Sequence, residues 1–232
     1  MKTVGVIGGM GSYATLDFFN KIICNTPAKE DQNHLHILID NYPQIPDRTS
    51  YLLGKGENPL PYILESAHKL INAGADILCM PCNTAHYFIN EIRNDIEIPF
   101  VSIVESVYEH INTYYKKQKN IGLIATKGTL TGKVFDDFFL KTDYNLIIPH
   151  GDFQEKITKL IYSIKSGVIR ENSNIFLNIM EMFKKLNAEV VIAGCTEIPL
   201  VLPHINQDLP VIDSNLVLAN KVIEIATSSN ES

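Results

Sequence analysis

The chain has 232 residues, of which 45% are hydrophobic and 20% are charged, so it is long enough to bury a large core and too apolar for a disordered segment. Its formal net charge of −6 argues against a surface that binds nucleic acid or an anionic membrane. We therefore expect a small-molecule partner, with no nucleic acid and no membrane.

The N-terminal residues 4–10 are apolar and superficially resemble a signal peptide, but Gly5, Gly8 and Gly9 interrupt the run. We interpret this segment as a first strand. No later stretch has the roughly 18 to 20 uninterrupted apolar residues that a transmembrane helix needs. The chain also has only 4 cysteines, too few for a disulfide-stapled scaffold of this length. We therefore expect a cytoplasmic protein with free thiols.

Short runs rich in Val and Ile alternate with longer segments of helical periodicity, which is typical of βαβ units and of parallel sheets buried on both faces. The segment 60–73 has the apolar spacing of an amphipathic helix and ends before Gly74, a common helix stop. In chain order, the expected strands are 3–7, 35–40, 77–80, 100–104, 121–125, 146–149, 190–193 and 211–213.

A weak internal repeat divides the chain into two halves. Residues 2–11 match 119–128, then 75–84 match 188–196, and 98–103 match 209–214, always at a similar offset. Chance resemblance among generic Val/Ile strands is the alternative, but it explains poorly why a cysteine ends the equivalent strand in both halves. The repeat predicts two α/β halves built on one plan.

Cys82 and Cys195 are these two cysteines, and they fall where parallel sheets bind ligands, beyond the carboxyl ends of strands. Asn83-Thr84 and Thr196-Glu197 follow them and are suited to cap a helix, whose N-terminus lowers a thiol pKa from about 8.5. Inversion of an amino acid's α-carbon needs a proton removed from one face and one returned to the other. Two opposed thiols, one ionised and one not, can exchange these roles.

The remaining cysteines are interpreted as small core residues, which is the usual role of a buried cysteine. Cys79 lies inside an apolar strand, and Cys24 falls in a run that we expect to be the packed face of the first helix.

The loops Cys82-Asn-Thr-Ala-His86 and Gly194-Cys-Thr-Glu-Ile198 resemble the paired signatures of the aspartate/glutamate racemase superfamily, whose members work without pyridoxal phosphate. Gly8-Gly-Met-Gly11 and Asn41-Tyr-Pro-Gln-Ile-Pro-Asp-Arg-Thr49 extend the resemblance over nearly the whole chain. It is closest to the aspartate racemases, because glutamate racemases typically open with Asp-Ser-Gly and follow the second cysteine with Thr-His. Ser12-Tyr13 departs from the family, which often has proline and a small or acidic residue there.

The resemblance implies a site in which Cys82 and Cys195 are the catalytic pair. Arg48 would grip the substrate's side-chain carboxylate with two parallel hydrogen bonds, and Lys165 would add a second cation. For Lys165 the simpler interpretation is an ordinary surface lysine. His86 is expected to cap or brace the helix after Cys82 and to transfer no proton.

The substrate's α-carboxylate would be held by side chains and backbone after both cysteines, with a further anion site at residues 8–11. The complete substrate-binding set implied by the resemblance is Met10, Asp47, Arg48, Thr49, Asn83, Thr84, Ala85, Thr126, Lys165, Thr196 and Glu197.

The resemblance also implies two pseudo-symmetric, doubly wound α/β domains with parallel sheets and the active site in the cleft between them. Family strands near the positions of Pro99 and Pro210 tend to cross between lobes, so we place one domain at 1–98 plus 207–232 and the other at 99–206. The expected reaction interconverts L- and D-aspartate, with glutamate or related amino acids possible, and uses neither metal nor pyridoxal phosphate. Family members are commonly homodimers, so we expect a homodimer.

Other functions fit parts of the sequence. Gly9-Met-Gly11-Ser-Tyr-Ala14 followed by Asp40 is similar to a dinucleotide site, although the acid comes later than the usual spacing of about 20 residues. Cys79 and Cys82 form a C-x-x-C pair, but an extended strand would place them about 10 Å apart, too far for a disulfide. A zinc site lacks a second ligand pair. A solute-binding protein could also have two α/β lobes, but it would not exchange the α-hydrogen of a bound amino acid.

Overall fold

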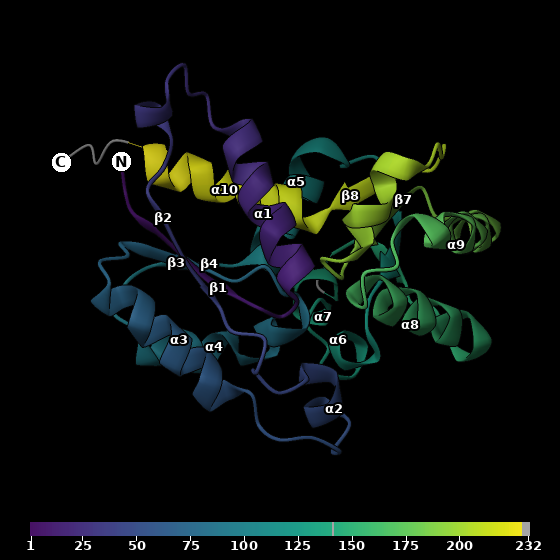
Figure 1. Ribbon diagram of the computed structural model, residues 1–232. Coiled ribbons are helices and arrows are strands. Elements are labelled where there is room, and N and C mark those ends of the chain that lie inside the picture. The colour runs from purple at the N-terminus through teal and green to yellow at the C-terminus, as the bar shows by residue number, and fades with distance from the viewer. Residues whose placement is uncertain (141, 229–232) are drawn as a thin grey trace.

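Two four-stranded parallel sheets form the framework of the computed structural model, which describes residues 1–140 and 142–228 (Figure 1). The strands are β1 Val4–Gly8, β2 Ile37–Asn41, β3 Ile77–Cys79, β4 Phe100–Val101, β5 Asn120–Ile124, β6 Asn145–Ile147, β7 Val190–Ala193 and β8 Val211–Asp213. The first sheet has the order β2-β1-β3-β4 and the second has β6-β5-β7-β8. The two halves therefore repeat one strand order, as the internal repeat predicts.

Helices cover both faces of each sheet, which explains why the strands are apolar throughout and do not alternate. The α-helices are α1 Ser12–Asn25, α2 Arg48–Leu52, α3 Leu60–Asn72, α4 Ile89–Asp95, α5 Ile103–Tyr114, α6 Lys127–Thr131, α7 Asp136–Phe139, α8 Gly151–Lys165, α9 Ser173–Lys185 and α10 Ser214–Thr227. The 3₁₀ helices are η1 Asp31–Asn33, η2 Thr84–Phe88, η3 Arg170–Asn172 and η4 Ile198–His204.

The two outer layers each have their own apolar core. Helices α3 and α4 pack Ile63 and Ile92 against one face of the first sheet. Helices α8 and α9 pack Leu160 and Phe176 against the corresponding face of the second sheet. The helical stripe expected at 60–73 is confirmed by α3, whose buried face includes Ile63 and whose N-terminus carries a proline.

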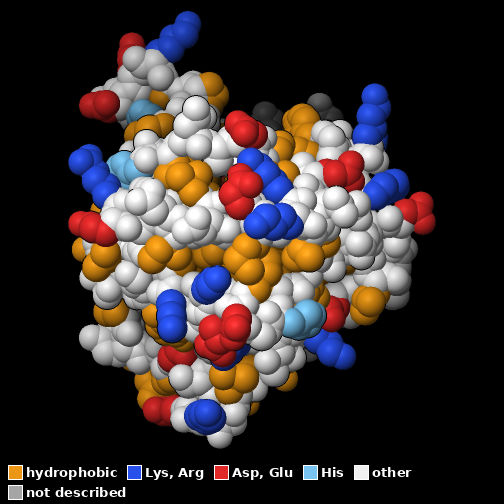
Figure 2. Space-filling view, turned by 90° about the vertical axis from the view of Figure 1, so that its right-hand side faces the viewer, with side chains coloured by type: hydrophobic (Ala, Val, Ile, Leu, Met, Phe, Trp, Pro, Cys, Tyr) orange, Lys and Arg blue, Asp and Glu red, His pale blue; other side chains and the backbone are white. Residues whose placement is uncertain are grey.

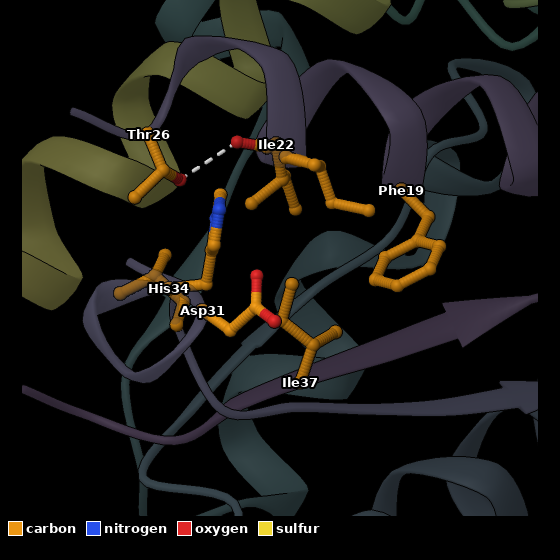
Figure 3. A pocket seen from close by; sticks show the side chains of 8 residues that line it. Phe19, Ile22, Thr26, Asp31, His34 and Ile37 are labelled. Atoms are coloured by element: carbon orange, nitrogen blue, oxygen red, sulfur yellow. Dashed lines mark hydrogen bonds between the residues drawn. The ribbon is translucent and has the colours of Figure 1, made fainter. Parts of the chain in front are cut away.

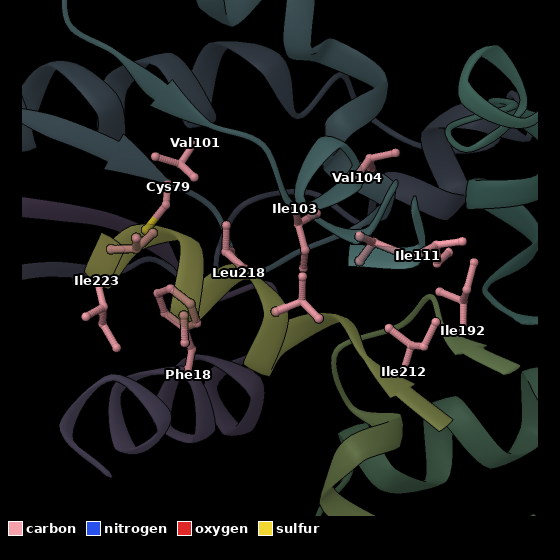
Figure 4. Close-up of a cluster of buried hydrophobic side chains, with 14 of the residues drawn as sticks. Phe18, Cys79, Val101, Ile103, Val104, Ile111, Ile192, Ile212, Leu218 and Ile223 are labelled. Atoms are coloured by element: carbon pink, nitrogen blue, oxygen red, sulfur yellow. The ribbon is translucent and has the colours of Figure 1, made fainter. Parts of the chain in front are cut away.

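A third hydrophobic core is continuous between the two lobes and holds them together (Figure 4). Phe18 of α1 and Leu218 of α10 pack against the first sheet, while Ile192 and Ile212 of the second sheet belong to the same cluster. Helix α10 packs against both α1 and α5 in this layer. The lobes therefore share one hydrophobic interior, so a change at their junction is transmitted to both.

The expected strands are confirmed, each within a few residues of its observed bounds, but the role of Cys24 was wrong. Cys24 is exposed, because the buried stripe of α1 consists of Ala14, Thr15, Phe18 and Ile22. A residue two positions after Ile22 points away from that stripe at 3.6 residues per turn. Cys79 is fully buried in β3, as expected.

The strand pairing also corrects the expected domain boundaries at 98/99 and 206/207. Strand β4 pairs with β3 and completes the first sheet, and β8 pairs with β7 and completes the second. Even the prolines before them take part, since Leu78 N–H donates to the Pro99 carbonyl and Val191 N–H donates to that of Pro210. Each fourth strand thus stays with the half that precedes it, and the chain crosses between lobes after it.

The outer face of the second lobe, over α8 and α9, is a mixed surface (Figure 2). Basic and acidic side chains are interspersed there around a band of hydrophobic side chains. A groove between the two helices is lined by Ile175 and Met182 together with Lys156, Lys159 and Lys185. Across the described ranges, no helix combines the length and the apolar character needed to cross a membrane.

Candidate active site

Cys82 and Cys195 lie just beyond the carboxyl ends of β3 and β7, which hold the same place in the two sheets. Both side chains are buried, each with 5% of its surface exposed. The loops that carry them touch, because the Thr196 hydroxyl donates to the carbonyl of Pro81 at 3.1 Å. The structure therefore brings the two predicted catalytic residues to one junction between the lobes.

A second chain of hydrogen bonds ties the first cysteine loop to the second lobe. The side-chain amide of Asn83 donates to the Ser214 hydroxyl at 3.1 Å, and that hydroxyl donates to the Ala193 carbonyl at 2.7 Å. The Asn83 side-chain oxygen has no hydrogen-bond partner among the described residues although it is buried. Asn83 is therefore held in place by its amide and retains a free acceptor.

Three buried threonine hydroxyls form a triangle at the same junction. Thr84 Oγ1 lies 3.0 Å from that of Thr126 and 2.8 Å from that of Thr129, and the latter two are 3.1 Å apart. Thr126 also caps α6, because its hydroxyl accepts the Thr129 N–H. Two predicted substrate-binding residues, one from each lobe, are thus joined through Thr129, which the sequence did not single out.

The first cysteine loop is braced by His86. Its Nδ1 lies 2.9 Å from the carbonyl oxygen of Cys82, and the Ile103 N–H donates to its Nε2 at 3.1 Å. Since Nε2 accepts a hydrogen bond, Nδ1 must carry the hydrogen and donate to Cys82. Burial lowers the pKa of His86 to about 4, so the imidazole is neutral near pH 7. The geometry supports the expected bracing role.

The second cysteine loop is organised around a carboxylate. The Cys195 thiol donates to Glu197 Oε2 at 3.0 Å, and the Gly11 N–H donates to Oε1 at 3.1 Å. Lys165 Nζ lies 3.9 Å from the same Oε1. Glu197 is only 1% exposed, so its charge requires these partners. The glycine-rich loop after β1 therefore gives a backbone donor to the protein's own carboxylate, a different use from the anion site expected at residues 8–11.

The expected lowering of the thiol pKa by a helix N-terminus is wrong for Cys195. Burial raises its pKa well above the ordinary value, and the neighbouring Glu197 carboxylate raises it further, while Lys165 opposes both. The structures after both cysteines are 3₁₀ helices, and neither Asn83 nor Glu197 caps them with its side chain. Cys195 is therefore a protonated thiol, hydrogen-bonded to Glu197.

Arg48 is clamped by backbone carbonyls at the start of α2. Its Nη1 donates to the carbonyls of Ile45 and Pro46 at 3.0 and 2.9 Å, and its Nη2 donates to that of Met10 at 3.3 Å. Its Nε is buried and has no partner among the described residues. The Nε and Nη2 hydrogens lie on one edge of the guanidinium, so this edge can present a fork to a carboxylate.

Asp47 and Tyr162 close the site beside Arg48, one from each lobe. Burial opposes ionisation of Asp47, but hydrogen bonds from the Ser50 N–H and hydroxyl, with help from Arg48, lower its pKa. The Tyr162 hydroxyl lies 3.5 Å from Asp47 Oδ1. Asp47 therefore caps α2 and is committed to Ser50 and Tyr162.

Lys165, the last residue of α8, is drawn into the junction and is not an ordinary surface lysine. Burial opposes its charge, but Glu197 and both cysteine sulfurs favour it, and its pKa is raised. Its Nζ also lies 5.7 Å from the centre of the Tyr162 ring. One cation thus interacts electrostatically with both predicted catalytic sulfurs.

The structure brings the predicted site residues together. Met10, Thr49 and Ala85 are also buried; the Met10 carbonyl accepts from Arg48, and Thr49 and Ala85 directly follow Arg48 and Thr84 in the chain. Sequence reasoning expected Gly11 within an anion site for the substrate, and it missed Thr129, Tyr162 and Ser214 as members of the hydrogen-bond network. The helix-capping pattern from Thr126 to Thr129 could have indicated Thr129. Nothing local marks Tyr162, because its partner is 115 positions away.

A separate hollow lies between α1, η1 and the start of β2, lined by Phe19, Ile22, Thr26, Asp31, His34 and Ile37 among others (Figure 3). Its volume is about 300 Å³. It sits at the amino end of β2, away from the strand ends that carry the cysteines, so we assign it no part in the chemistry. Within 1–140 and 142–228, no cluster of three His, Cys, Asp or Glu side chains could hold a metal ion.

Comparisons with known proteins agree with this arrangement. The family model described as Asp/Glu/hydantoin racemase matches residues 7–222. The broad specificity amino-acid racemase RacX of Bacillus subtilis is 27% identical over 230 residues, which cover 95% of this chain and 96% of that protein. The structure of Picrophilus torridus aspartate racemase is 28% identical, with a TM-score of 0.87 and coverage of 97% of this chain and 94% of the other.

The fold extends to more distant structures. Glutamate racemase from Francisella tularensis, in complex with D-glutamate, superimposes with a TM-score of 0.72 at 16% identity, covering 100% of this chain and 84% of the other. At this identity the likeness concerns the two-domain α/β fold alone, which confirms the expected fold class. The family match spans nearly the whole chain and confirms the resemblance first seen in the two cysteine loops. The chain belongs to the Asp/Glu/hydantoin racemase family and is an amino-acid racemase.

Proposed function

We propose that this protein interconverts L- and D-aspartate without a cofactor, using Cys82 and Cys195 as two opposed acid/base groups. The observation that carries the proposal is the pair of buried thiols at equivalent strand ends, in loops joined by the bond from Thr196 to Pro81. Both sulfurs also interact with Lys165. A cation that attracts either thiolate suits a site in which no more than one sulfur is ionised at a time.

The proposed reaction moves one proton on and one proton off. The thiolate on one side takes the α-proton and becomes a thiol, and the electron pair is delocalised into the α-carboxylate. The thiol on the other side then gives its proton to the opposite face and becomes the thiolate. Atoms and charge balance, and the enzyme is left in the mirror protonation state, which is the form that processes the other enantiomer.

The surroundings of Cys195 favour one starting form. Its thiol donates to Glu197 and burial raises its pKa, so Cys195 begins as the acid and Cys82 as the base. Glu197 acts through the sulfur and is a positioning residue. Deprotonation of Cys195 beside this carboxylate is offset by Lys165, whose Nζ lies 3.9 Å from Glu197 Oε1.

Arg48 supports aspartate as the substrate. Arg48 is 6% exposed and three carbonyls fix its guanidinium, whose buried Nε has no partner among the described residues and would donate to a side-chain carboxylate. A clamped fork loses little entropy on binding. The similarity to an aspartate racemase favours this substrate, and the similarity to a broad specificity racemase leaves glutamate or related amino acids as further substrates.

The test replaces each thiol singly, with Cys82→Ala and Cys195→Ala, and follows L- and D-aspartate in deuterated water by chiral chromatography and mass spectrometry. We expect racemisation to fall by about 10³-fold or more in each, since a positioned acid or base contributes about 10²- to 10⁴-fold. Each variant could still exchange the α-hydrogen of one enantiomer without inverting it.

Cys24→Ala is the matched control, because Cys24 is an exposed thiol outside the site, and it should keep full activity. Full two-way racemisation by either Cys82→Ala or Cys195→Ala would rule out the two-thiol mechanism. A wild-type protein that binds aspartate but never exchanges its α-hydrogen would instead be a binding protein, the alternative from another class.

A further inference from the structure

Helices α2 and α6 pack closely across the junction between the lobes, at Thr49 and Gly128. Helix α2 begins with Arg48 and Thr49, and α6 follows Thr126. A Cβ atom placed on Gly128 would lie 2.7 Å from the Thr49 Cα, 2.7 Å from its hydroxyl oxygen and 3.0 Å from Thr84 Cγ2. Contacts under 3.0 Å to backbone force a displacement. Gly128 has helical backbone, so this position needs glycine for space.

The α6 side of this contact is fixed to the reacting centre. Thr126 and Thr129, which flank Gly128, belong to the hydroxyl triangle with Thr84. Thr84 follows Cys82 by two residues. Movement of α6 away from the centre would therefore break hydrogen bonds between buried hydroxyls, each of which is costly to leave unmade.

The α2 side of the contact carries the carboxylate fork. Arg48 precedes Thr49, and three backbone carbonyls hold its guanidinium. Because the side chain is clamped and buried, it follows the position of the α2 backbone. The spacing between α2 and α6 therefore sets the spacing between the Arg48 guanidinium and the half of the site that the second lobe supplies.

We propose that Gly128 is a specificity-determining residue, which lets α6 seat directly on Thr49 and so sets the distance from Arg48 to the reacting carbon for a four-carbon amino diacid. This inference rests on the proposed aspartate racemase function. Glutamate adds one methylene between its two carboxylates, about 1.5 Å of bond length. A site closed to the length of aspartate disfavours glutamate by compression, whereas a site opened by a methyl group at residue 128 accommodates it better.

The experiment measures kcat/KM for L-aspartate and L-glutamate in wild type and Gly128→Ala. We expect the variant to lose activity on aspartate and the ratio of glutamate to aspartate activity to rise about tenfold or more, since one methylene changes specificity by about 10- to 200-fold. Inhibition by succinate and glutarate should follow: wild type should prefer succinate, and the variant should shift toward glutarate.

Gly132→Ala is the matched control on the same helix. A Cβ there would meet the Tyr87 ring at 2.9 Å, the Gly128 carbonyl oxygen at 3.2 Å and a Leu52 methyl group at 3.3 Å. None of these atoms belongs to the α2 backbone, so the substrate ratio of this variant should equal that of wild type. An unchanged ratio in a folded Gly128→Ala protein that still racemises aspartate overturns the inference and leaves the proposed function standing. Absence of aspartate racemisation in wild type overturns the proposed function itself.

A second variant covers the case in which Gly128→Ala does not fold. Combining it with Thr49→Gly removes the hydroxyl that the new methyl group would meet and leaves its contacts with the α2 backbone and with Thr84 Cγ2. The expected change in the substrate ratio has the same direction and a smaller size. A folded double variant with the wild-type ratio, or wild type that binds succinate and glutarate equally well, would overturn the role of Gly128.

Discussion

The two cysteine loops hold equivalent places in the two sheets and differ in their electrostatics. The loop of Cys82 is braced by a neutral imidazole, since His86 donates to the Cys82 carbonyl and accepts from Ile103. The loop of Cys195 contains the buried carboxylate of Glu197, which accepts the thiol hydrogen. His86 therefore holds the backbone of Cys82, whereas Glu197 interacts with the sulfur of Cys195 itself.

This difference teaches that a repeated topology supplies positions and leaves the chemistry to single residues. Strand order places both cysteines at equivalent strand ends. The electrostatics of the loops differ, because Glu197 adds a carboxylate beside Cys195 and His86 adds a neutral imidazole beside Cys82. For the proposed two-thiol mechanism this asymmetry is useful, because the two groups must differ in protonation at the start and at the end of each turnover. Three substitutions break or sharpen the comparison.

Glu197→Gln should have the largest effect, because it makes the second loop as neutral as the first. We expect a fall in kcat/KM of about 100-fold or more. Removal of the negative charge should lower the pKa of Cys195, which Glu197 helps to raise. In the proposed mechanism, activity falls at high pH because Cys195 loses the proton that it donates, so this basic limb of the profile should move to lower pH. Measurement of kcat/KM against pH provides the check.

Glu181→Gln is the control for this experiment, because Glu181 is an exposed carboxylate paired with Lys184 on α9. It should leave the pH profile in place. A Glu197→Gln protein with reduced activity but an unmoved basic limb would show that Glu197 only supports the fold of the loop and does not control the Cys195 proton.

His86 should make the first loop sensitive to acid through folding stability. Its pKa in the folded protein is lowered to about 4, against an ordinary value of about 6.5. Between pH 6.5 and pH 4, the imidazole is therefore protonated in the unfolded chain and neutral in the folded protein. The resulting stability is fully present above pH 6.5 and is lost as the pH falls toward 4, by about 3 kcal/mol at most. Urea unfolding between pH 7 and pH 4 measures it.

His86→Gln, which cannot titrate, should show a smaller acid loss than wild type over this range. His204→Gln, at an exposed position after the second cysteine, should reproduce the wild-type curve. If wild type and His86→Gln lose equal stability on acidification, then His86 does not remain neutral in the folded protein.

The framework of the fold could be predicted because parallel strands buried on both faces must be apolar runs, and β1, β5 and β7 are such runs in the sequence. The cysteine loops could be predicted because each follows such an apolar run, β3 for Cys82 and β7 for Cys195. Two wrong predictions about the fold, the burial of Cys24 and the domain boundaries, depended on finer geometry. Cys24 lies off the buried stripe of α1 by a fraction of a turn, and β4 and β8 each pair with the sheet of the preceding half before the chain crosses to the other lobe.

The interior of the site could be predicted only as a set of residues. The partner of the Gly11 N–H is Glu197, 186 positions away, and no local pattern indicates that a glycine-rich loop will bind a carboxylate of the same chain. Gly128 matches Gly11 in the internal repeat, but this match did not indicate its role, which depends on the approach of Thr49 from the other lobe. Residue types are local information, whereas the pairing of buried donors with acceptors is decided by the tertiary fold.

Thr196→Val should have the smallest effect, since it removes only the bond that joins the two loops, from the Thr196 hydroxyl to the Pro81 carbonyl. We expect unfolding by urea to show a loss of about 1 kcal/mol. Thr113→Val is the control, because that hydroxyl is exposed and bonds within α5. The kcat/KM values for L- and D-aspartate should fall by the same factor, because the enantiomers have equal free energies and a change in loop spacing cannot favour one direction. A loss no larger than that of Thr113→Val, with unchanged kcat/KM, would mean that packing alone sets the spacing of the two sulfurs.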